Sequence, residues 1–251
     1  MTKVLIFGCN GHMGHVLCDL IDQMDGVTVA AGVDYKAAEE KSFPFFTSLE
    51  DCDVDVDAII DFSSAKAVDG TLDYVAEHKI PLVECTTGLS EEQIRHLEET
   101  SKKTAVLRSA NMSLGVNTLL KLVKAAQEIL GEAGYDVEIV EKHHRRKLDA
   151  PSGTAIALAD AVNAGAGGKF EYVYGRSERR QARPDNEIGI SSVRGGTIVG
   201  EHDVIFAGTD EVIEFKHTAY SRAIFGKGAI QAAIYLAGKP AGLYDMSDVI
   251  G

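Results

Sequence analysis

The sequence lacks the features that mark disulfide-rich, zinc-binding or repetitive proteins. It has only four cysteines in 251 residues, with no CxxC pair and no spacing typical of metal ligands. They stand at Cys9, Cys18, Cys52 and Cys85. We therefore expect reduced cysteines in the protein interior and no bound zinc. No internal repeat or low-complexity segment is present.

Long hydrophobic runs are also missing. The apolar run in MTKVLIFG, at the start, is shorter than the core of a signal peptide. No stretch approaches the ~20 apolar residues that a membrane-spanning helix needs. We therefore expect a cytoplasmic protein with no membrane association. With 45% hydrophobic and 25% charged residues, its composition is that of an ordinary globular protein of one or two domains.

Basic residues are in the minority, with 25 Lys and Arg against 38 Asp and Glu and a formal net charge of -13. This balance argues against nucleic acid as a partner. Three cations nevertheless stand together at Arg145, Arg146 and Lys147. In an acidic chain such a cluster focuses a small anion, although a solvated loop is the plainer alternative.

The cations lie in the stretch with the most varied polar chemistry, EIVEKHHRRKLDAPSGTAIALADA at residues 138–161. A strand pattern ends at His143 and His144, and Ser152 is the expected N-cap of a helix that continues to about residue 164. The N–H groups of Gly153 and Thr154 then lie at the positive end of that helix, where a carboxylate or phosphate binds readily. We expect an anion to dock there.

A second candidate site lies near the start of the chain. A strand at 3–7 is followed by Gly8, Gly11 and Gly14 and then by a helical pattern. Strand, glycine turn and helix in this order suit pyrophosphate binding, although a tight turn without a ligand has the same pattern. Asp34 follows the next strand, at 27–33, where an acid can accept hydrogen bonds from an adenosine ribose.

The acid disfavours a 2′-phosphate on that ribose, but two nearby residues, Lys36 and His12, offset the repulsion. We therefore predict that the chain uses both NADH and NADPH.

The first half continues as alternating strands and helices. Strands are expected at 58–62, 81–85 and 105–107, and helices at 65–78 and 91–102. This order predicts a doubly wound parallel sheet whose ligand lies at the carboxyl ends of the strands. Each of these ends offers small or amide-bearing groups that suit ribose and carboxamide contacts, or that are plain turn residues. The residues at the ends are Phe62, Ser63, Thr86, Thr87, Gly88, Ala110 and Asn111.

The pattern changes after a long amphipathic helix at 114–130. Strand-like runs at 138–141, 170–174, 189–193, 198–206 and 211–217 predict an α+β domain with an open mixed sheet. A polar run at 176–186 predicts a mobile surface loop, and a last helix is expected at 222–237. The fold class is therefore α/β, with a Rossmann-type parallel sheet and a second, α+β domain.

Several motifs in this order closely resemble the bacterial 4-hydroxy-tetrahydrodipicolinate reductases, formerly called dihydrodipicolinate reductases. The most specific is HHRRKLDAPSGTA at 143–155. The others are GCNGHMG at 8–14, TTG at 86–88, ANMSLGVN at 110–117, GEHDVIF at 200–206 and SRAIFGKGA at 221–229. His12 stands where the family usually has Arg or Lys, and Cys85 where Gly usually precedes TTG.

The resemblance implies an enzyme of lysine and diaminopimelate biosynthesis that reduces a cyclic imino dicarboxylate. It implies a dinucleotide-binding domain at 1–112, rejoined by 223–251, and a substrate-binding and oligomerisation domain at 113–222 that forms a homotetramer. By position, His143 matches the proton donor and Lys147 the second catalytic residue. His144, Ser152, Gly153 and Thr154 match the substrate contacts. The matching cofactor contacts extend those above with Asn10, Met13, Met112 and Arg222.

The residues fit this chemistry on their own terms. A dicarboxylate needs an anion clamp, and hydride addition to a conjugated imine leaves an anion that must be protonated. His143 suits the acid by residue type, and Lys147 can stabilise developing negative charge. Tandem histidines are sometimes metal ligands, but without a third ligand at suitable spacing we expect no metal.

Two other functions share part of this pattern. A dehydrogenase acting on another amino-acid-derived carbonyl would have the same nucleotide half. A nucleotide sensor that lost catalysis would need neither His143 nor Lys147.

Overall fold

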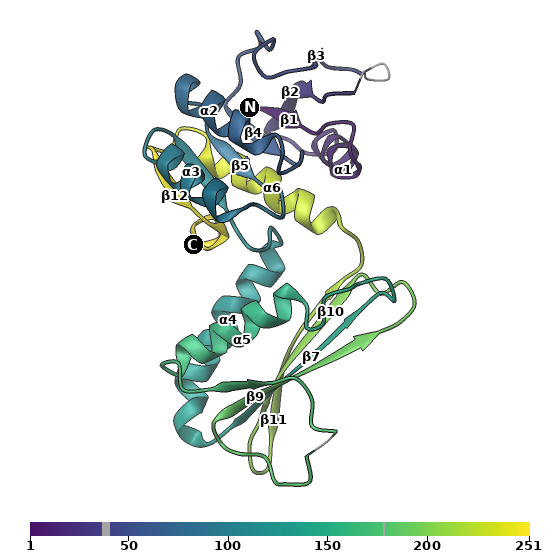
Figure 1. Cartoon of the computed structure of the whole chain (residues 1–251), viewed down its shortest axis with the longest axis vertical. Helices are drawn as coiled ribbons and strands as arrows, with labels where there is room; N and C mark the ends of the chain where they lie inside the picture. The colour runs from purple at the N-terminus through teal and green to yellow at the C-terminus, as the bar shows by residue number, and fades with distance from the viewer. Residues whose placement is uncertain (37–40, 178) are drawn as a thin grey trace. The chain divides into compact units, whose positions relative to one another are not determined.

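A computed structural model describes residues 1–36, 41–177 and 179–251 (Figure 1). The chain divides into two compact units. Unit 1 is formed by Met1–Leu114 together with Ala223–Gly251, and unit 2 by Gly115–Arg222. Each unit has its own sheet and its own hydrophobic core.

Unit 1 is built on a parallel sheet, which has seven strands within the described residues, in the order β12-β6-β5-β4-β1-β2-β3. The strands are β1 (Thr2–Phe7), β2 (Val27–Val33), β3 (Phe45–Phe46), β4 (Ala58–Asp61), β5 (Leu82–Glu84), β6 (Ala105–Arg108) and β12 (Gly242–Tyr244). From β1 the chain first adds β2 and β3 on one side, and it then crosses to the other side of β1 to add β4, β5, β6 and β12. Ligands of such sheets bind at the carboxyl ends of the strands, where the chain changes sides.

Helices cover both faces of the unit 1 sheet. They are α1 (His12–Ile21), α2 (Val68–His78), α3 (Glu91–Ser101), α6 (Ala223–Leu236) and α7 (Met246–Ile250). Neighbouring residues of β1 point to opposite faces: Ile6 packs in the core that contains α1 and α6, and Leu5 in the core that contains α2 and α3. The parallel, doubly wound sheet is as expected from the sequence.

Unit 2 has a mixed sheet in the order β11-β10-β7-β9-β8. Its strands are β7 (Asp136–His143), β8 (Glu171–Val173), β9 (Glu187–Arg194), β10 (Gly200–Ala207) and β11 (Val212–Ala219). β9 runs parallel to β7 and β8, whereas β10 is antiparallel to β7 and β11. Helices α4 (Leu114–Leu130) and α5 (Gly153–Gly165) pack on the sheet through one apolar core, and a short 3₁₀ turn, η1 (Gly131–Ala133), follows α4. The predicted open mixed sheet is confirmed.

Several predicted boundaries differ from those in the structure, and two of these differences have local reasons. The helix expected from Ala65 begins at Val68, because the N–H of Ala67 bonds to the carbonyl of Ser64 and closes a turn first. The strand expected from Ile198 begins at Gly200, after a turn in which Gly196 has φ +49°.

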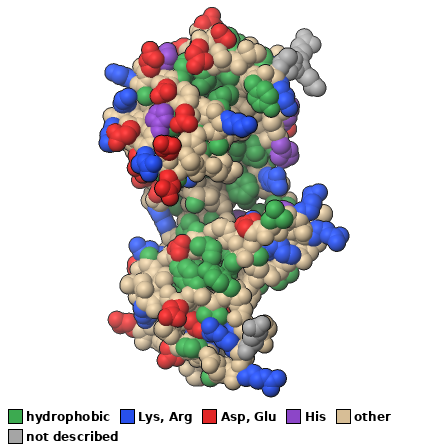
Figure 2. All heavy atoms as spheres, viewed as in Figure 1, with side chains coloured by type: hydrophobic (Ala, Val, Ile, Leu, Met, Phe, Trp, Pro, Cys, Tyr) green, Lys and Arg blue, Asp and Glu red, His purple; other side chains and the backbone are tan. Residues whose placement is uncertain are grey.

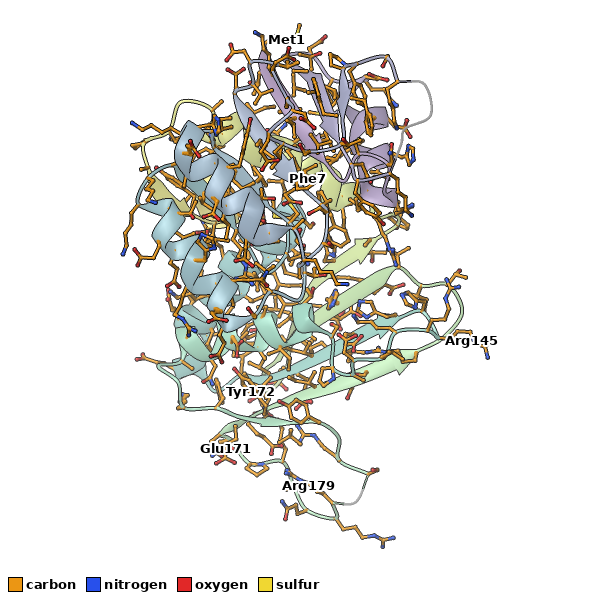
Figure 3. All side chains as sticks on the ribbon, turned by 45° about the horizontal axis from the view of Figure 1, so that its top comes forward. Met1, Phe7, Arg145, Glu171, Tyr172 and Arg179 are labelled. Carbon is orange, nitrogen blue, oxygen red and sulfur yellow. The ribbon has the colours of Figure 1, made fainter. Side chains whose placement is uncertain are left out.

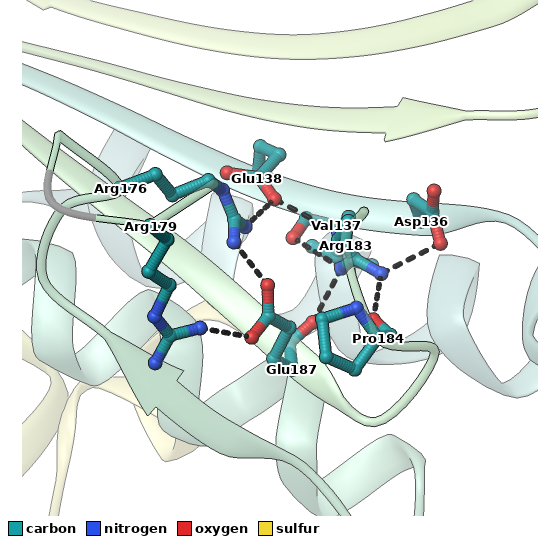
Figure 4. Close-up of polar contacts among 8 residues, drawn as sticks. All are labelled: Asp136, Val137, Glu138, Arg176, Arg179, Arg183, Pro184 and Glu187. Carbon is teal, nitrogen blue, oxygen red and sulfur yellow. Dashed lines mark hydrogen bonds and ion pairs between the residues drawn. The ribbon is translucent and has the colours of Figure 1, made fainter. Parts of the chain in front are cut away.

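The run at 176–186 was expected to be a mobile surface loop. Its described residues form no helix or strand, and Glu178 lies outside them. Three arginines nevertheless bind acids on β7 and β9 (Figure 4). Arg176 and Arg179 both pair with Glu187, while Arg183 bonds to Glu138 at 3.0 Å and to Asp136 at 2.7 Å. These ion pairs tie the loop to the sheet.

The surface of unit 1 carries many acidic side chains (Figure 2), as the excess of Asp and Glu in the sequence leads one to expect. Figure 2 shows Asp and Glu side chains gathered on the visible face of unit 1, in keeping with the negative net charge. Within the described residues, every helix is too short or too polar to cross a bilayer.

Candidate functional site

The histidine-rich stretch forms the end of β7, a loop and the start of α5 in unit 2. β7 ends at His143, and the loop that follows carries Arg145 at its tip (Figure 3). Ser152 is the N-cap of α5, as expected: its hydroxyl accepts a hydrogen bond from the N–H of Ala155 at 3.2 Å.

A buried carboxylate, Glu141, organises this region. Residues alternate along β7, so Glu141 and His143 share the buried face that carries the apolar core. Glu141 accepts hydrogen bonds from Nδ1 of His143 at 2.6 Å and from the N–H of Ser152 at 3.1 Å. Arg194 binds the same carboxylate in a bidentate manner: Nη1 donates to Oε2 at 2.7 Å, and Nη2 donates to Oε1 at 2.6 Å. One carboxylate thus holds the end of the strand, the start of the helix and β9 together.

Burial and these hydrogen bonds shift the pKa of Glu141 in opposite directions, and the same is true of His143. Burial alone would raise the pKa of Glu141, but hydrogen bonds from Arg194, His143 and Ser192 overcome it and lower the pKa to about 2. Burial lowers the pKa of His143, although Glu141 opposes the shift. Glu141 is therefore an anion at neutral pH beside an imidazole that holds a second proton weakly.

A second histidine, His202, completes the buried cluster around Glu141. His202 on β10 is 4% exposed, and its ring meets the His143 ring edge-on with centroids 5.2 Å apart. Its Nε2 lies 3.1 Å from the hydroxyl of Ser152. Burial, followed by the nearby His143, lowers the pKa of His202 to about 4, so this ring is neutral near pH 7.

The loop between β7 and α5 holds the remaining predicted residues of this site. Lys147 was expected to offer positive charge to a ligand, and its Nζ lies 2.9 Å from the carboxylate of Asp149. Arg145 and Arg146 are exposed. His144 is half-buried, and within the described residues its Nδ1 has no hydrogen-bond partner.

The start of α5 is open to an incoming group. Gly153 is exposed, and a Cβ added there would meet nothing within 4 Å. Thr154 follows in the first turn and is half-buried. A helix of 13 residues presents a positive dipole at this end, which favours a carboxylate. Ser152 differs from these two residues because it is 2% exposed and its hydroxyl already caps the helix.

The glycine turn in unit 1 brings backbone segments unusually close together. Gly8 has φ +82°, and a Cβ there would lie 2.7 Å from the carbonyl oxygen of Phe62. A Cβ on Gly14 would lie 2.4 Å from the carbonyl oxygen of Gly8. Gly11 is exposed and caps α1 without a side-chain hydrogen bond. The turn therefore needs small residues, and the first turn of α1 remains available to an anion.

Asp34 is buried beside this turn and binds backbone from two segments. Its carboxylate accepts hydrogen bonds from the N–H of Asn10 at 3.1 Å and from the N–H of Lys36 at 3.2 Å. The Asn10 side chain also donates to the carbonyl of Lys36 at 3.1 Å. His12 is exposed at the start of α1, and Met13 next to it is half-buried.

The other predicted cofactor contacts follow the carboxyl ends of β4, β5 and β6. Ser63 donates its N–H to Asp61 at 2.7 Å, and Thr86 donates its N–H to Glu84 at 2.7 Å. The remaining residues differ in how far they reach solvent: Thr87, Gly88 and Ala110 are exposed, Phe62 and Asn111 are half-buried, and Met112 is buried. Arg222 is exposed immediately before α6.

Sequence reasoning missed several of the buried polar residues in both units, although it found Asp34, His143 and Ser152. Glu141 had a readable signal, because an acid two residues before His143 must share its face of the strand. Arg194 and His202 come from other strands, and their proximity to His143 depends on the sheet order. Asp61 and Glu84 had no such signal within their own strands. Within the described residues, no group of three or more His, Cys, Asp or Glu side chains is arranged to hold a metal.

Comparison with known proteins identifies the family to which the chain is similar. The family pattern described as "Dihydrodipicolinate reductase, N-terminus" matches residues 2–112, and "Dihydrodipicolinate reductase, C-terminus" matches residues 115–250. A 4-hydroxy-tetrahydrodipicolinate reductase of Caldanaerobacter subterraneus is 50% identical over 100% of this chain and 98% of the relative. The reductase of Clostridium tetani is 44% identical over 98% of this chain and 96% of its own length.

A solved structure has the same fold. It is the dipicolinate-bound dihydrodipicolinate reductase from Paenisporosarcina sp. TG-14, with a TM-score of 0.82 and 23% identity, over 98% of this chain and 97% of the other. At that identity the likeness shows the fold, and the sequence matches show the family. The chain belongs to the dihydrodipicolinate reductase family.

Proposed function

We propose that this chain reduces 4-hydroxy-tetrahydrodipicolinate to tetrahydrodipicolinate, for lysine and diaminopimelate biosynthesis, with a reduced nicotinamide nucleotide as the hydride donor. The observation that carries the proposal is the stretch HHRRKLDAPSGTA at 143–155, in a chain 50% identical to a reductase of that name. Within this stretch an acid–base group, His143, and an open helix start at Gly153 lie at the two ends of one loop.

The nucleotide belongs to unit 1. The close approaches at Gly8 and Gly14 and the uncapped first turn of α1 fit a pyrophosphate, which needs backbone N–H groups and no side chains in the way. Asp34 lies at the end of β2, where it can also accept from a ribose hydroxyl. When bound, the nicotinamide ring supplies the hydride for the reduction.

Other residues at the carboxyl edge of the sheet complete the nucleotide site. We assign them by their place in the fold and by the family motifs they match. They are Asn10, Gly11, His12, Met13, Phe62, Ser63, Thr86, Thr87, Gly88, Ala110, Asn111, Met112 and Arg222. We propose that both NADH and NADPH bind, because Asp34 favours the free ribose while exposed His12 and Lys36 offer positive charge to a 2′-phosphate.

The substrate belongs to unit 2. One of its carboxylates accepts hydrogen bonds from the N–H groups of Gly153 and Thr154 at the positive end of α5. Lys147 exchanges its contact with Asp149 for the substrate and stabilises negative charge that develops during reduction. His144 donates from its ring, and Ser152 acts by capping and orienting the helix start rather than by direct contact.

His143 delivers the proton. Its pKa is lowered by burial, so its protonated form is a stronger acid than a free imidazole and gives its proton readily to the anion formed by hydride addition. Its neighbours Glu141 and Arg194 keep the ring in place.

The protein is proposed to be cytoplasmic and a homotetramer assembled through unit 2. The family resemblance supports the assembly, and sedimentation of the purified chain tests it.

The reaction is tested by mixing pyruvate and aspartate semialdehyde with the enzyme that condenses them, adding this chain, and following oxidation of NADH or NADPH. Oxidation that requires both the condensation product and this chain is expected. No oxidation with that product, combined with oxidation in the presence of another amino-acid-derived carbonyl, would replace the proposed substrate.

A further inference from the structure

The buried Glu141 carboxylate accepts more hydrogen bonds than a simple ion pair with Arg194 would provide. It lies at the centre of the unit 2 sheet, opposite His202 on β10 and Ser192 on β9. Its side chain is 0% exposed, on the strand face that otherwise carries apolar residues. An ionised carboxylate at such a place is strongly destabilising unless its oxygens are fully hydrogen-bonded.

Donors on three neighbouring segments meet this requirement in a defined arrangement. Oε1 accepts from Nη2 of Arg194 and from the N–H of Ser152, while Oε2 accepts from Nη1 of Arg194 and from Nδ1 of His143. Arg194 is itself held by a hydrogen bond from Nη2 to the carbonyl oxygen of Asp149 at 2.6 Å. The carboxylate therefore cannot turn without losing several charge-assisted bonds.

This arrangement fixes which nitrogen of His143 carries a proton. An ionised carboxylate only accepts hydrogen bonds, so the ring nitrogen 2.6 Å away must be the donor. Nδ1–H is then present in both the neutral and the charged imidazole, and Nε2 is the nitrogen that gains and loses a proton. Nε2 faces Gly200, where an added Cβ would lie 3.1 Å from it, so the absence of a side chain leaves room beside this nitrogen.

We propose that Glu141 is a positioning residue of the reaction: oriented by Arg194, its carboxylate holds His143 as the Nδ1–H tautomer and reserves Nε2 for transfer of the proton to the substrate. The role rests on the proposed function of the site. In the proton step, the N–H bond at Nε2 breaks and a bond from that proton to the substrate anion forms, which leaves His143 neutral with its Nδ1–H on Glu141.

Four charged or titratable groups face His143 from the surrounding elements. Glu141 on its own strand favours the charged ring, whereas Lys147 on the following loop, Arg194 on β9 and His202 on β10 oppose it. Replacing Glu141 by Gln removes the group that favours protonation and leaves the other three. His143 should then lose its proton at lower pH.

The first test uses the unmodified full-length chain without ligands. Nitrogen-15 NMR of labelled histidines, with the His143 signal assigned by its loss in His143→Gln, reports which ring nitrogen carries the proton at each pH. We expect neutral His143 to be protonated at Nδ1. A neutral ring protonated at Nε2 would overturn the proposal, and this arm needs no variant of Glu141 to fold.

The second test compares Glu141→Gln with Glu141→Asp. In Glu141→Gln, the His143 titration and the alkaline limb of the kcat profile should move to lower pH by the same interval. At a fixed pH on that limb, kcat of Glu141→Gln should be about tenfold lower than that of the parent for each pH unit by which the limb moves. The KM for the substrate should change by less than about threefold, since ground-state binding is not removed. Glu141→Asp keeps the charge and should recover part of both effects.

Glu138→Gln is the matched control. Glu138 lies on the same strand but pairs with Arg176 and Arg183, away from His143. It should leave the His143 titration and the kcat profile unchanged. Equal changes in Glu138→Gln and Glu141→Gln would contradict a specific role for Glu141. Failure of the proposed reaction is distinguishable, because the unmodified chain would then lack turnover while the NMR result stands.

Discussion

Asp61 and Glu84 are buried carboxyl groups at the carboxyl ends of neighbouring parallel strands, β4 and β5, where they stand directly in register. Asp61 accepts from the N–H of Ser63, and Glu84 from the N–H of Thr86. One oxygen of each, Oδ2 and Oε2, is buried without a partner within the described residues. Two acids so placed cannot both ionise without cost.

This pair makes the stability of the chain depend on pH. Burial, and then the charge of Asp61, raise the pKa of Glu84 to about 8 from the value of 4.5 that an exposed glutamate has in the unfolded chain. The folded state therefore binds more protons between these values, and stability that is present below pH 4.5 is lost as pH rises towards about 8.

We predict that Glu84→Gln, which keeps the shape and removes the charge, makes the chain more resistant to urea at about pH 9 and changes little at about pH 5. Urea midpoints across this pH range measure the effect. Exposed Glu77→Gln on α2 is the control and should leave the pH dependence as it is. A constant difference between Glu84→Gln and the parent at every pH would contradict the raised pKa.

The glycine turn of unit 1 should not tolerate a side chain at Gly14. Alanine there places its Cβ 2.4 Å from the carbonyl oxygen of Gly8, and backbone atoms cannot move aside as a flexible side chain does. We expect Gly14→Ala to destabilise the protein by about 1–3 kcal/mol, as overpacking usually does.

Gly70, in the first turn of α2, is the matched control for Gly14, because a Cβ there meets nothing within 4 Å. Gly70→Ala should stabilise the chain, by up to about 1 kcal/mol. Thermal melts of both variants compare the two signs. Equal effects of the two substitutions would show that the close approach at Gly14 is not what limits this turn.

Loss of the proton donor should affect turnover more than binding. We predict that His143→Gln lowers kcat by about 10²-fold or more, because general acid catalysis is worth that much, with a smaller change in KM. Steady-state kinetics with the condensation product measure both. His78→Gln, an exposed histidine on α2, is the control. A kcat for His143→Gln within about twofold of the parent would remove His143 from the mechanism.

The nucleotide preference should be weak. Asp34 disfavours a 2′-phosphate, while exposed His12 and Lys36 attract it, so kcat/KM should be of similar size with NADH and NADPH. A preference above roughly 10³-fold, about 4 kcal/mol, would contradict use of both nucleotides. Replacing Lys36 by Ala should shift the balance towards NADH.

Long elements with clear periodicity were predictable from the sequence. The strand Val27–Val33 and the helix Leu114–Leu130 have the expected bounds. β3, β12 and α7, which have two, three and five residues, were not predicted from the sequence. Their existence depends on neighbours: β3 pairs with β2, and β12 with β6.

The residues of the site likewise fall into those that local sequence predicts and those that only the strand order brings together. The N-cap at Ser152 follows from local sequence, because capping involves residues three apart. The surroundings of His143 do not, because Arg194 and His202 stand on β9 and β10 and reach it only through the strand order of the sheet. The contact of Lys147 with Asp149 is local, because the two residues lie in the same loop, but it was not predicted.

The most direct test of the proposed site is a crystal structure of the chain with a nicotinamide nucleotide and dipicolinate bound. We predict a carboxylate of dipicolinate within hydrogen-bond distance of the N–H groups of Gly153 and Thr154. Nε2 of His143 should face the ring of dipicolinate. Carboxylates bound away from Gly153 and Thr154, with His143 remote from the ligand, would contradict the proposed site.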